Sequence, residues 1–187
     1  MEKLKTLSLA DESAFDYARE APETARDRSV FVYGALMADE CIEALLGGLV
    51  AKSRVISKRP GTVKQYARFS MPKGAVEAGV VPSPEATELP GVLLEMLQPV
   101  ELRAIDAYMH PSFDRLLTSV TVQNGFGGSE ELEALMYSCP PESKELLDMS
   151  RLWNYSEFRE RHLQAFIQEV VTPCRSKFEH EEGLRKK

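Results

Sequence analysis

The sequence predicts a mixed α+β fold in which short strands form an antiparallel sheet or small barrel and a few helices flank it. Three observations support this class. Short extended segments cut by proline and glycine fill residues 49–97. Apolar residues recur at helical spacing in three other stretches. A glycine-rich turn joins two further extended segments near residues 124–129, which indicates a hairpin.

The first two elements follow from local signals. The run VFVYGALM at 30–37 begins with β-branched and aromatic residues and meets a glycine, which is typical of a buried strand that enters a tight turn. The stretch 38–48 then places Cys41, Ile42, Leu45 and Leu46 on one helical face and ends in two glycines, so it predicts a short amphipathic helix.

The middle of the chain predicts strands and one more helix. Extended segments are expected at 49–57, 62–70, 76–81 and 91–97, with breaks at Pro60-Gly61, Pro72, Pro82, Pro84 and Pro90-Gly91. Residues 99–109 predict a helix, because Pro99 suits its first position and its apolar residues have helical spacing; its end is expected at His110-Pro111.

The last third predicts a hairpin and a terminal helix. Residues 115–123 and 131–138 are the two strands. The helix is expected within 152–171, with Asn154 as its cap, Glu157 three residues later, and Trp153 buried as an anchor. We expect this helix to lie across the sheet.

Length and composition indicate one domain. A chain of 187 residues with 43% hydrophobic content can bury one sizeable core. We place this domain at residues 29–172, after a polar N-terminal extension (1–28) with a short helix at Ser13–Glu20, and before a charged, mobile C-terminal tail (173–187).

Charge and cysteine content exclude several classes of protein. A net charge of -6 and a pI near 5.2 provide no general basic surface for nucleic acid, and no apolar run is long enough to cross a membrane. The N-terminus also lacks the apolar core of a secretory signal. Three widely spaced cysteines suggest neither a disulfide framework nor a zinc site. We therefore expect a soluble protein of the cytoplasm or another reducing intracellular compartment, with no cofactor.

Six segments in order resemble the γ-glutamylcyclotransferase-like superfamily, in particular the branch that includes plant avirulence-induced proteins. They are FVYGALM, RPGTVKQYARF, LPGVLLEML, ELRAIDAYMHPSFDRLLTSVTV, LEALMYS and LWNYSEFRERHLQAFI, and together they span Ser29 to Val171. The first motif is fairly specific, whereas the others gain weight from their order. The resemblance implies a small, partly closed β-barrel with flanking helices. Without the later segments, Tyr33-Gly34 would be read as the end of a strand.

The resemblance also implies a pocket and a reaction. Backbone N–H groups of the turn Tyr33, Gly34, Ala35 and Leu36 would hold the polar α end of a γ-glutamyl ligand, and a glycine permits that close approach. Ala35 stands where the family often has threonine. In the implied reaction, the α-amine of the ligand attacks its own side-chain carbonyl and releases 5-oxoproline and an amine. A carboxylate removes a proton from the α-ammonium group.

One position departs from the family pattern. Ile105-Asp106, Phe113 and Arg115 match the family's motif around its catalytic glutamate, but the glutamate position itself is Met109. A thioether cannot act as a general base. Asp106, one helical turn before Met109, and Asp114 are the candidate substitutes, and Arg115 is a candidate ligand-binding residue or a structural ion-pair partner.

Three hypotheses remain open at this point. The first is a retained γ-glutamyl pocket with weak or lost cyclotransferase activity. The second is an active cyclotransferase with a relocated carboxylate. The third is a non-catalytic subunit or scaffold that binds a protein partner. His110, His162 and His180 lie on different segments, so neither a catalytic nor a metal role is expected for them.

Overall fold

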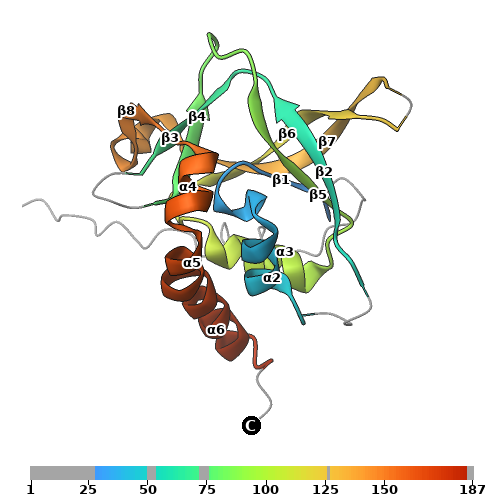
Figure 1. Ribbon diagram of the computed structural model, residues 1–187, viewed down its shortest axis with the longest axis vertical. Helices are drawn as coiled ribbons and strands as arrows, with labels where there is room; N and C mark the ends of the chain where they lie inside the picture. Colours follow the sequence, from blue (N-terminus) through green and yellow to red (C-terminus); the bar gives the residue numbers. More distant parts are fainter. Residues whose placement is uncertain (1–27, 50–53, 72–75, 126, 185–187) are drawn as a thin grey trace, which may run out of the picture.

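The computed structural model describes residues 28–49, 54–71, 76–125 and 127–184, so the N-terminal extension with its expected helix lies outside the described residues. Its centre is a closed five-stranded barrel (Figure 1). The barrel strands, in spatial order, are β1 (Val30–Val32), β5 (Leu89–Glu95), β2 (Ser57–Val63), β6 (Asp114–Gln123) and β7 (Ser129–Ser138). The α+β class and the barrel expected from the sequence are confirmed.

A parallel contact closes the barrel. Neighbouring strands pair antiparallel around the ring, except that β1 meets β7 in parallel through Val30 and Leu135. A second, three-stranded sheet has the order β4 (Ala78–Pro82), β3 (Tyr66–Ser70) and β8 (Asp148–Leu152). A 3₁₀ helix at Pro141–Leu146 precedes β8. The second sheet matters for the site because β4 begins beside the turn that follows β1.

Two proline–glycine pairs do not break the strands, which corrects the expectation from the sequence. Pro60-Gly61 lies within β2 and Pro90-Gly91 within β5, where the two glycines pair with each other. Strand β2 has no partner in β6 at Pro60, and strand β5 has no partner in β1 at Pro90. A proline is tolerated at these positions because the side of the strand without a partner needs no backbone N–H for pairing.

The two helices expected early in the chain are present. Helix α2 (Asp39–Leu46) buries Cys41, Ile42, Leu45 and Leu46, as its spacing predicted. Helix α3 (Pro99–Tyr108) begins with Pro99 and a capping box between Gln98 and Glu101. Glu101 is 1% exposed and pairs with Arg54 at 2.5 Å, so its role is structural.

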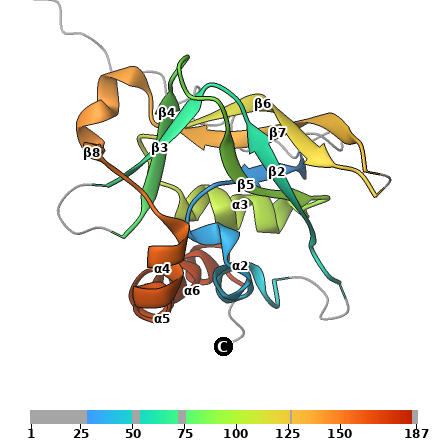
Figure 2. The same cartoon turned by 45° about the horizontal axis from the view of Figure 1, so that its top comes forward.

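The C-terminal helical segment is longer than expected and lies elsewhere. It comprises α4 (Tyr155–Arg161), α5 (Leu163–Phe166), a π-helical turn (Ile167–Val171) and α6 (Thr172–Glu181). The Asn154 side chain accepts a hydrogen bond from the Glu157 N–H at 3.0 Å, so the predicted cap is confirmed. Because α2 and α3 already cover this side of the barrel, α6 packs on them and not across the sheet (Figures 1 and 2).

The expectation of a mobile tail after residue 172 is wrong for residues 173–181, which lie in α6. Phe178 of α6 is 4% exposed, and Arg103 of α3 forms an ion pair with Glu182 at 2.8 Å. A buried aromatic ring and a continuous helix hold this charged stretch in place.

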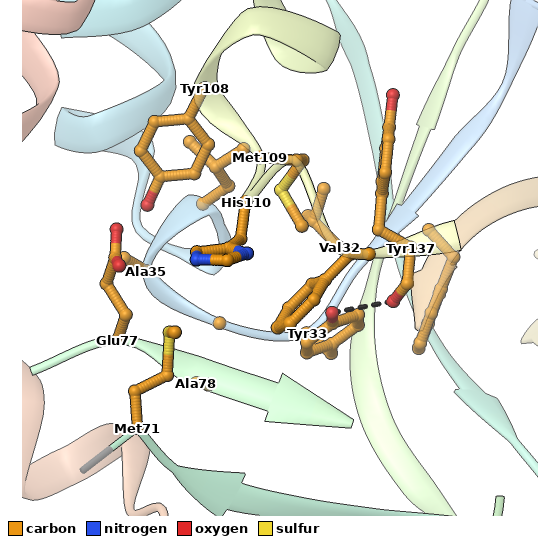
Figure 3. Close-up of a pocket in the computed structure, with 14 residues that line it drawn as sticks. Val32, Tyr33, Ala35, Met71, Glu77, Ala78, Tyr108, Met109, His110 and Tyr137 are labelled. Carbon is orange, nitrogen blue, oxygen red and sulfur yellow. Dashed lines mark hydrogen bonds between the residues drawn. The ribbon is translucent and has the colours of Figure 1, made fainter. Parts of the chain in front are cut away.

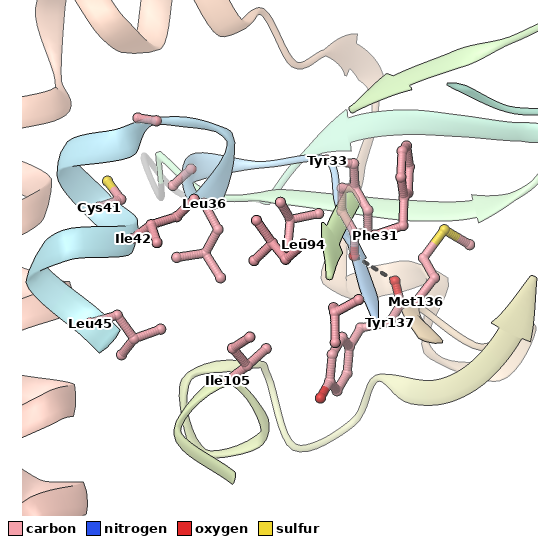
Figure 4. Packing of buried hydrophobic residues seen from close by; sticks show 14 of the residues in the cluster. Phe31, Tyr33, Leu36, Cys41, Ile42, Leu45, Leu94, Ile105, Met136 and Tyr137 are labelled. Atoms are coloured by element: carbon pink, nitrogen blue, oxygen red, sulfur yellow. Dashed lines mark hydrogen bonds between the residues drawn. The ribbon is translucent and has the colours of Figure 1, made fainter. Parts of the chain in front are cut away.

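One apolar core joins the barrel to its helices. Phe31 of β1 and Leu94 of β5 contribute from the barrel, Leu45 from α2, and Ile105 from α3 (Figure 4). Trp153 is 7% exposed and belongs to the same cluster, which confirms the prediction that it is buried. Within the described residues, no helix has the length and apolar character needed to span a membrane.

Candidate functional site

A cavity opens where β1 ends, between the barrel, the start of β4 and the end of α3 (Figure 3). The empty space in and in front of it is about 490 Å³, a figure that includes the open solvent at its mouth. The described lining residues are Phe31, Val32, Tyr33, Gly34, Ala35, Leu36, Met71, Glu77, Ala78, Tyr108, Met109, His110, Phe113 and Tyr137. The structure thus brings together the turn and the Met109 position that the sequence singled out.

The turn after β1 forms one wall. Residues Ala35–Met37 form a short 3₁₀ helix, and Gly34 is its N-cap. As the first amides of that helix, the N–H groups of Ala35 and Leu36 have no acceptor within it. Two of the cavity's backbone N–H groups are therefore left without an intrahelical partner.

Close packing accounts for the glycine at position 34. Its φ is -117°, so we find no positive φ that would require glycine. A Cβ atom at this position would lie 3.3 Å from the Ala78 Cβ, a tight contact with the start of β4. Gly34 thus lets the turn and β4 approach each other across the cavity.

Met109 is the C-cap of α3. Its N–H donates to the Ile105 carbonyl at 3.0 Å, and its extended backbone turns the chain out of the helix. The next residue, His110, also lines the cavity, which the sequence did not lead us to expect. The Ser112 N–H donates to His110 Nδ1 at 3.2 Å, which places the ring proton of the neutral imidazole on Nε2.

Asp106 and Arg115 form an ion pair beside the cavity and are not among its described lining residues. Arg115 Nη1 donates to the two oxygens of Asp106 at 3.0 and 2.9 Å. The Tyr137 hydroxyl also donates to Asp106, and the Tyr33 hydroxyl donates to the Tyr137 carbonyl at 2.6 Å. These bonds tie α3 to β6, β7 and the turn, and they occupy the Asp106 carboxylate.

Two tyrosines of this network are buried as neutral groups. Burial raises the pKa of both Tyr33 and Tyr137 above the ordinary value for tyrosine, and the nearby Asp106 charge adds to the effect at Tyr137. Asp114 is exposed at the start of β6, where it pairs with Ser138, and it is not among the described lining residues.

Glu77 is a cavity residue that the sequence analysis did not identify. It lies just before β4 and is half-buried, and its carboxylate lies in the cavity region near Tyr108 (Figure 3). On its other side it borders a second hollow lined by His162 and Glu169. The one signal in the sequence was a charged residue inside the apolar run VEAGVV. The strand β4 begins directly after this residue and is mostly buried.

Burial raises the pKa of Glu77 above its usual value of 4.5. Because the folded protein holds this proton more tightly than the unfolded chain, stability falls as the pH rises from 4.5 through the raised pKa. We expect Glu77→Gln, which cannot ionise, to gain thermal stability relative to the unmodified protein as the pH rises.

Thermal unfolding of the two proteins at an acidic and at a mildly alkaline pH measures this difference. Glu88→Gln, which removes an exposed carboxylate, is the control and should show no such trend. A stability difference between Glu77→Gln and the unmodified protein that is independent of pH would contradict the burial of the charged form.

Arg68 and Trp153 hold the two walls of the cavity in place. The Arg68 guanidinium donates to the Tyr33 carbonyl and lies over the Trp153 ring, 4.8 Å from its centroid. Trp153 Nε1 donates to the Val76 carbonyl at 2.7 Å. Burial lowers the pKa of Arg68 to about 10. This pair links the turn at Tyr33 to the residue that precedes Glu77.

Among the described residues, no three side chains of His, Cys, Asp or Glu gather in a group that could hold a metal ion. The chemistry available in the cavity itself is that of the Glu77 carboxyl, the His110 imidazole, phenol groups and backbone amides.

Fold and cavity together define a small α+β barrel protein with an open cavity at the end of its first strand. The model of the family "Gamma-glutamyl cyclotransferase, AIG2-like" matches residues 30–155, and the chain belongs to this family. The resemblance inferred from the sequence is thereby confirmed.

Individual relatives agree with this assignment. AIG2-like protein D of Arabidopsis thaliana is 26% identical over 144 residues, which cover 77% of this chain and 87% of the relative. Two solution structures of Arabidopsis thaliana proteins have the same fold, each with a TM-score of 0.54. They share 22% and 19% identity with this chain and cover 88% and 87% of it; the matches span 97% and 87% of those proteins.

Proposed function

We propose that this protein binds a γ-glutamyl-type small molecule in the cavity at the end of β1. The observation that carries the proposal is that all four residues of the turn, Tyr33–Leu36, line one cavity together with Met109. These are the positions at which the family resemblance places the ligand and the catalytic base. Family membership supports the same ligand class.

The polar α end of the ligand would lie at the turn. The amides of Ala35 and Leu36 have no acceptor in the 3₁₀ helix and can donate to a carboxylate. The remaining lining is largely apolar and aromatic, with Met71, Ala78 and Phe113 among its members. This composition favours a γ-glutamyl amide whose amine portion is small and carries no charged group of its own.

Met109 leaves no base at the position where the resemblance implies one. The family reaction, release of 5-oxoproline, therefore requires a carboxylate from elsewhere in the cavity, because loss of a general base commonly costs about 10²- to 10⁴-fold in rate.

Calorimetric titration with the butylamide of γ-linked glutamate tests ligand binding. The α-linked isomer, with the same composition and charge, is the reference ligand. We expect the γ-linked compound to bind and the α-linked isomer to bind at least about tenfold more weakly, since its polar groups would lack partners at the turn.

We expect Gly34→Val to weaken binding of the γ-linked compound at least about tenfold, because the new side chain presses on Ala78 and costs about 1–3 kcal/mol in a closely packed site. Gly125→Val is the control, since a Cβ at position 125 meets nothing within 4 Å among the described residues other than its chain neighbours. Equal binding of both isomers, or unchanged binding by a folded Gly34→Val variant, would refute the proposed site.

A further inference from the structure

We propose that Glu77 supplies the carboxylate that position 109 lacks, and that it serves as the general base and acid for 5-oxoproline formation from a γ-glutamyl amide. This inference rests on the proposed function, because it requires the γ-glutamyl ligand to occupy the same cavity. It assigns the proton-transfer role to the segment before β4, whereas the family pattern places it at the end of α3.

The first argument is position. Glu77 and Met109 line the same cavity from two walls, the start of β4 and the C-cap of α3 (Figure 3). Ala78, the residue after Glu77, lies so close to Gly34 that a Cβ added at position 34 would be 3.3 Å from the Ala78 Cβ, so this wall lies against the turn that would hold the α end of the ligand. The α-ammonium group adjoins the α-carboxylate, so a carboxylate beside the turn is well placed to accept its proton.

The second argument is the comparison with the other acidic residues. Among the described lining residues, Glu77 alone carries a carboxylate. Asp106 is engaged by Arg115 and Tyr137, and Asp114 is exposed outside the cavity. No donor among the described residues hydrogen-bonds to the Glu77 carboxylate.

The third argument is that the backbone of Glu77 is held firmly, although no donor among the described residues holds its side chain. The Met71 N–H donates to the Glu77 carbonyl at 3.0 Å, and Trp153 holds the carbonyl of the preceding residue, Val76. Ala78 then pairs with Ser70 in the second sheet. A general base needs this kind of fixed backbone, because proton transfer requires hydrogen-bond distance in a defined direction.

The electrostatic surroundings suit a base whose pKa lies above the usual value for glutamate. Burial raises the pKa of Glu77, and the charge of Glu77 contributes to the raised pKa of Tyr33, Tyr108 and Cys174. The titratable groups around it are thus two phenols and a thiol, the imidazole of His110 in the same lining, and His162 and Glu169 in the second hollow. A positively charged ammonium group would stabilise the Glu77 carboxylate in the complex.

The reaction balances with Glu77 as the only proton carrier. The carboxylate takes a proton from the α-ammonium, and the freed nitrogen lone pair forms a bond to the γ-carbonyl carbon. Collapse of the tetrahedral intermediate breaks the bond to the leaving nitrogen. Of the three ammonium protons, one stays on the ring nitrogen and two pass through the Glu77 carboxyl to the leaving amine. The products are 5-oxoproline and the protonated amine, and Glu77 returns to its starting state.

The test measures 5-oxoproline and butylamine released from γ-glutamyl butylamide by the unmodified protein, Glu77→Gln and Glu88→Gln. We expect equimolar release by the unmodified protein and by Glu88→Gln. For Glu77→Gln we expect a rate lower by about 10²- to 10⁴-fold. The rate of the unmodified protein should rise with pH along a limb above the usual range for glutamate, and this limb should be absent in Glu77→Gln.

Calorimetry on the same samples separates failure of this inference from failure of the proposed function. Binding of the amide without 5-oxoproline release, or release that Glu77→Gln leaves unchanged, would overturn the role of Glu77 and leave the binding site standing. Absence of binding would overturn the proposed function itself. If Glu77→Gln does not fold, Glu77→Asp provides the measurement: we expect a reduced rate with the pH limb retained, and an unchanged rate would overturn the assignment.

Discussion

The double variant Glu77→Gln/Met109→Glu is expected to release 5-oxoproline about 10²- to 10⁴-fold faster than Glu77→Gln alone. Both positions line the same cavity as the turn that would hold the ligand. A carboxylate restored at the end of α3 would therefore reach the same ammonium group from another wall. Single-turnover measurement of 5-oxoproline on the two variants gives this ratio directly.

The matched control is Met109→Gln in the Glu77→Gln background. It has nearly the same shape as Met109→Glu and no base, so we expect it to stay at the low rate of Glu77→Gln. A double variant that folds, binds γ-glutamyl butylamide and gains nothing over this control would show that position 109 does not reach the reacting nitrogen.

Met109→Glu in the otherwise unmodified protein should behave differently. Two carboxylates in one poorly solvated cavity repel each other, so that one of them retains its proton to a higher pH. We therefore expect the rising limb of the pH profile to broaden and to extend to higher pH, because it then reports the pair and not a single group.

Gly91→Ala is expected to destabilise the barrel by about 1–3 kcal/mol or more, the usual cost of overpacking a filled core. A Cβ at this position would lie 2.4 Å from Phe31 Cζ and 2.5 Å from the Val32 carbonyl oxygen. Phe31 is 1% exposed and has little room to move, and the Val32 oxygen belongs to the backbone of β1. Urea denaturation measures the loss.

Gly125→Ala is the control for this substitution, because the same methyl group there meets no described residue within 4 Å apart from its chain neighbours. Its effect should stay within about 0.5 kcal/mol. The double variant Phe31→Leu/Gly91→Ala should lose less stability than the sum of the two single variants. The smaller side chain at position 31 leaves the space that the added methyl group needs. Equal effects of the two alanine substitutions would mean that β5 and β1 are not packed as closely as the structure has them.

Elements with strong local signals could be predicted from the sequence. The apolar spacing of α2 identified its four buried residues, and Asn154 with Glu157 identified the start of α4. The glycine-rich turn identified the hairpin of β6 and β7. In each case the residues that decide the structure lie within a few positions of one another, so the pattern was visible without any knowledge of the fold.

Local signals failed where long-range contacts compete with them. Pro60-Gly61 and Pro90-Gly91 look like breaks, but the pairing of two distant strands and the packing of Phe31 over Gly91 keep them extended. The charged stretch 173–181 looks like a tail, but α2 and α3 provide an apolar surface that covers Phe178. Tertiary burial outweighs weak local propensity in such segments.

For the candidate site, the sequence by itself indicated the family, singled out the turn Tyr33–Leu36, and predicted that Met109 stands where the resemblance implies a base. These features lie in short motifs that can be read in order along the chain. Only the tertiary structure decided which carboxylate faces the turn. It engages Asp106 with Arg115, leaves Asp114 outside the cavity and brings Glu77 in through the contact of Ala78 with Gly34. That contact joins residues 44 positions apart (78 minus 34), a separation at which side-chain proximity depends on sheet pairing and packing and not on local sequence.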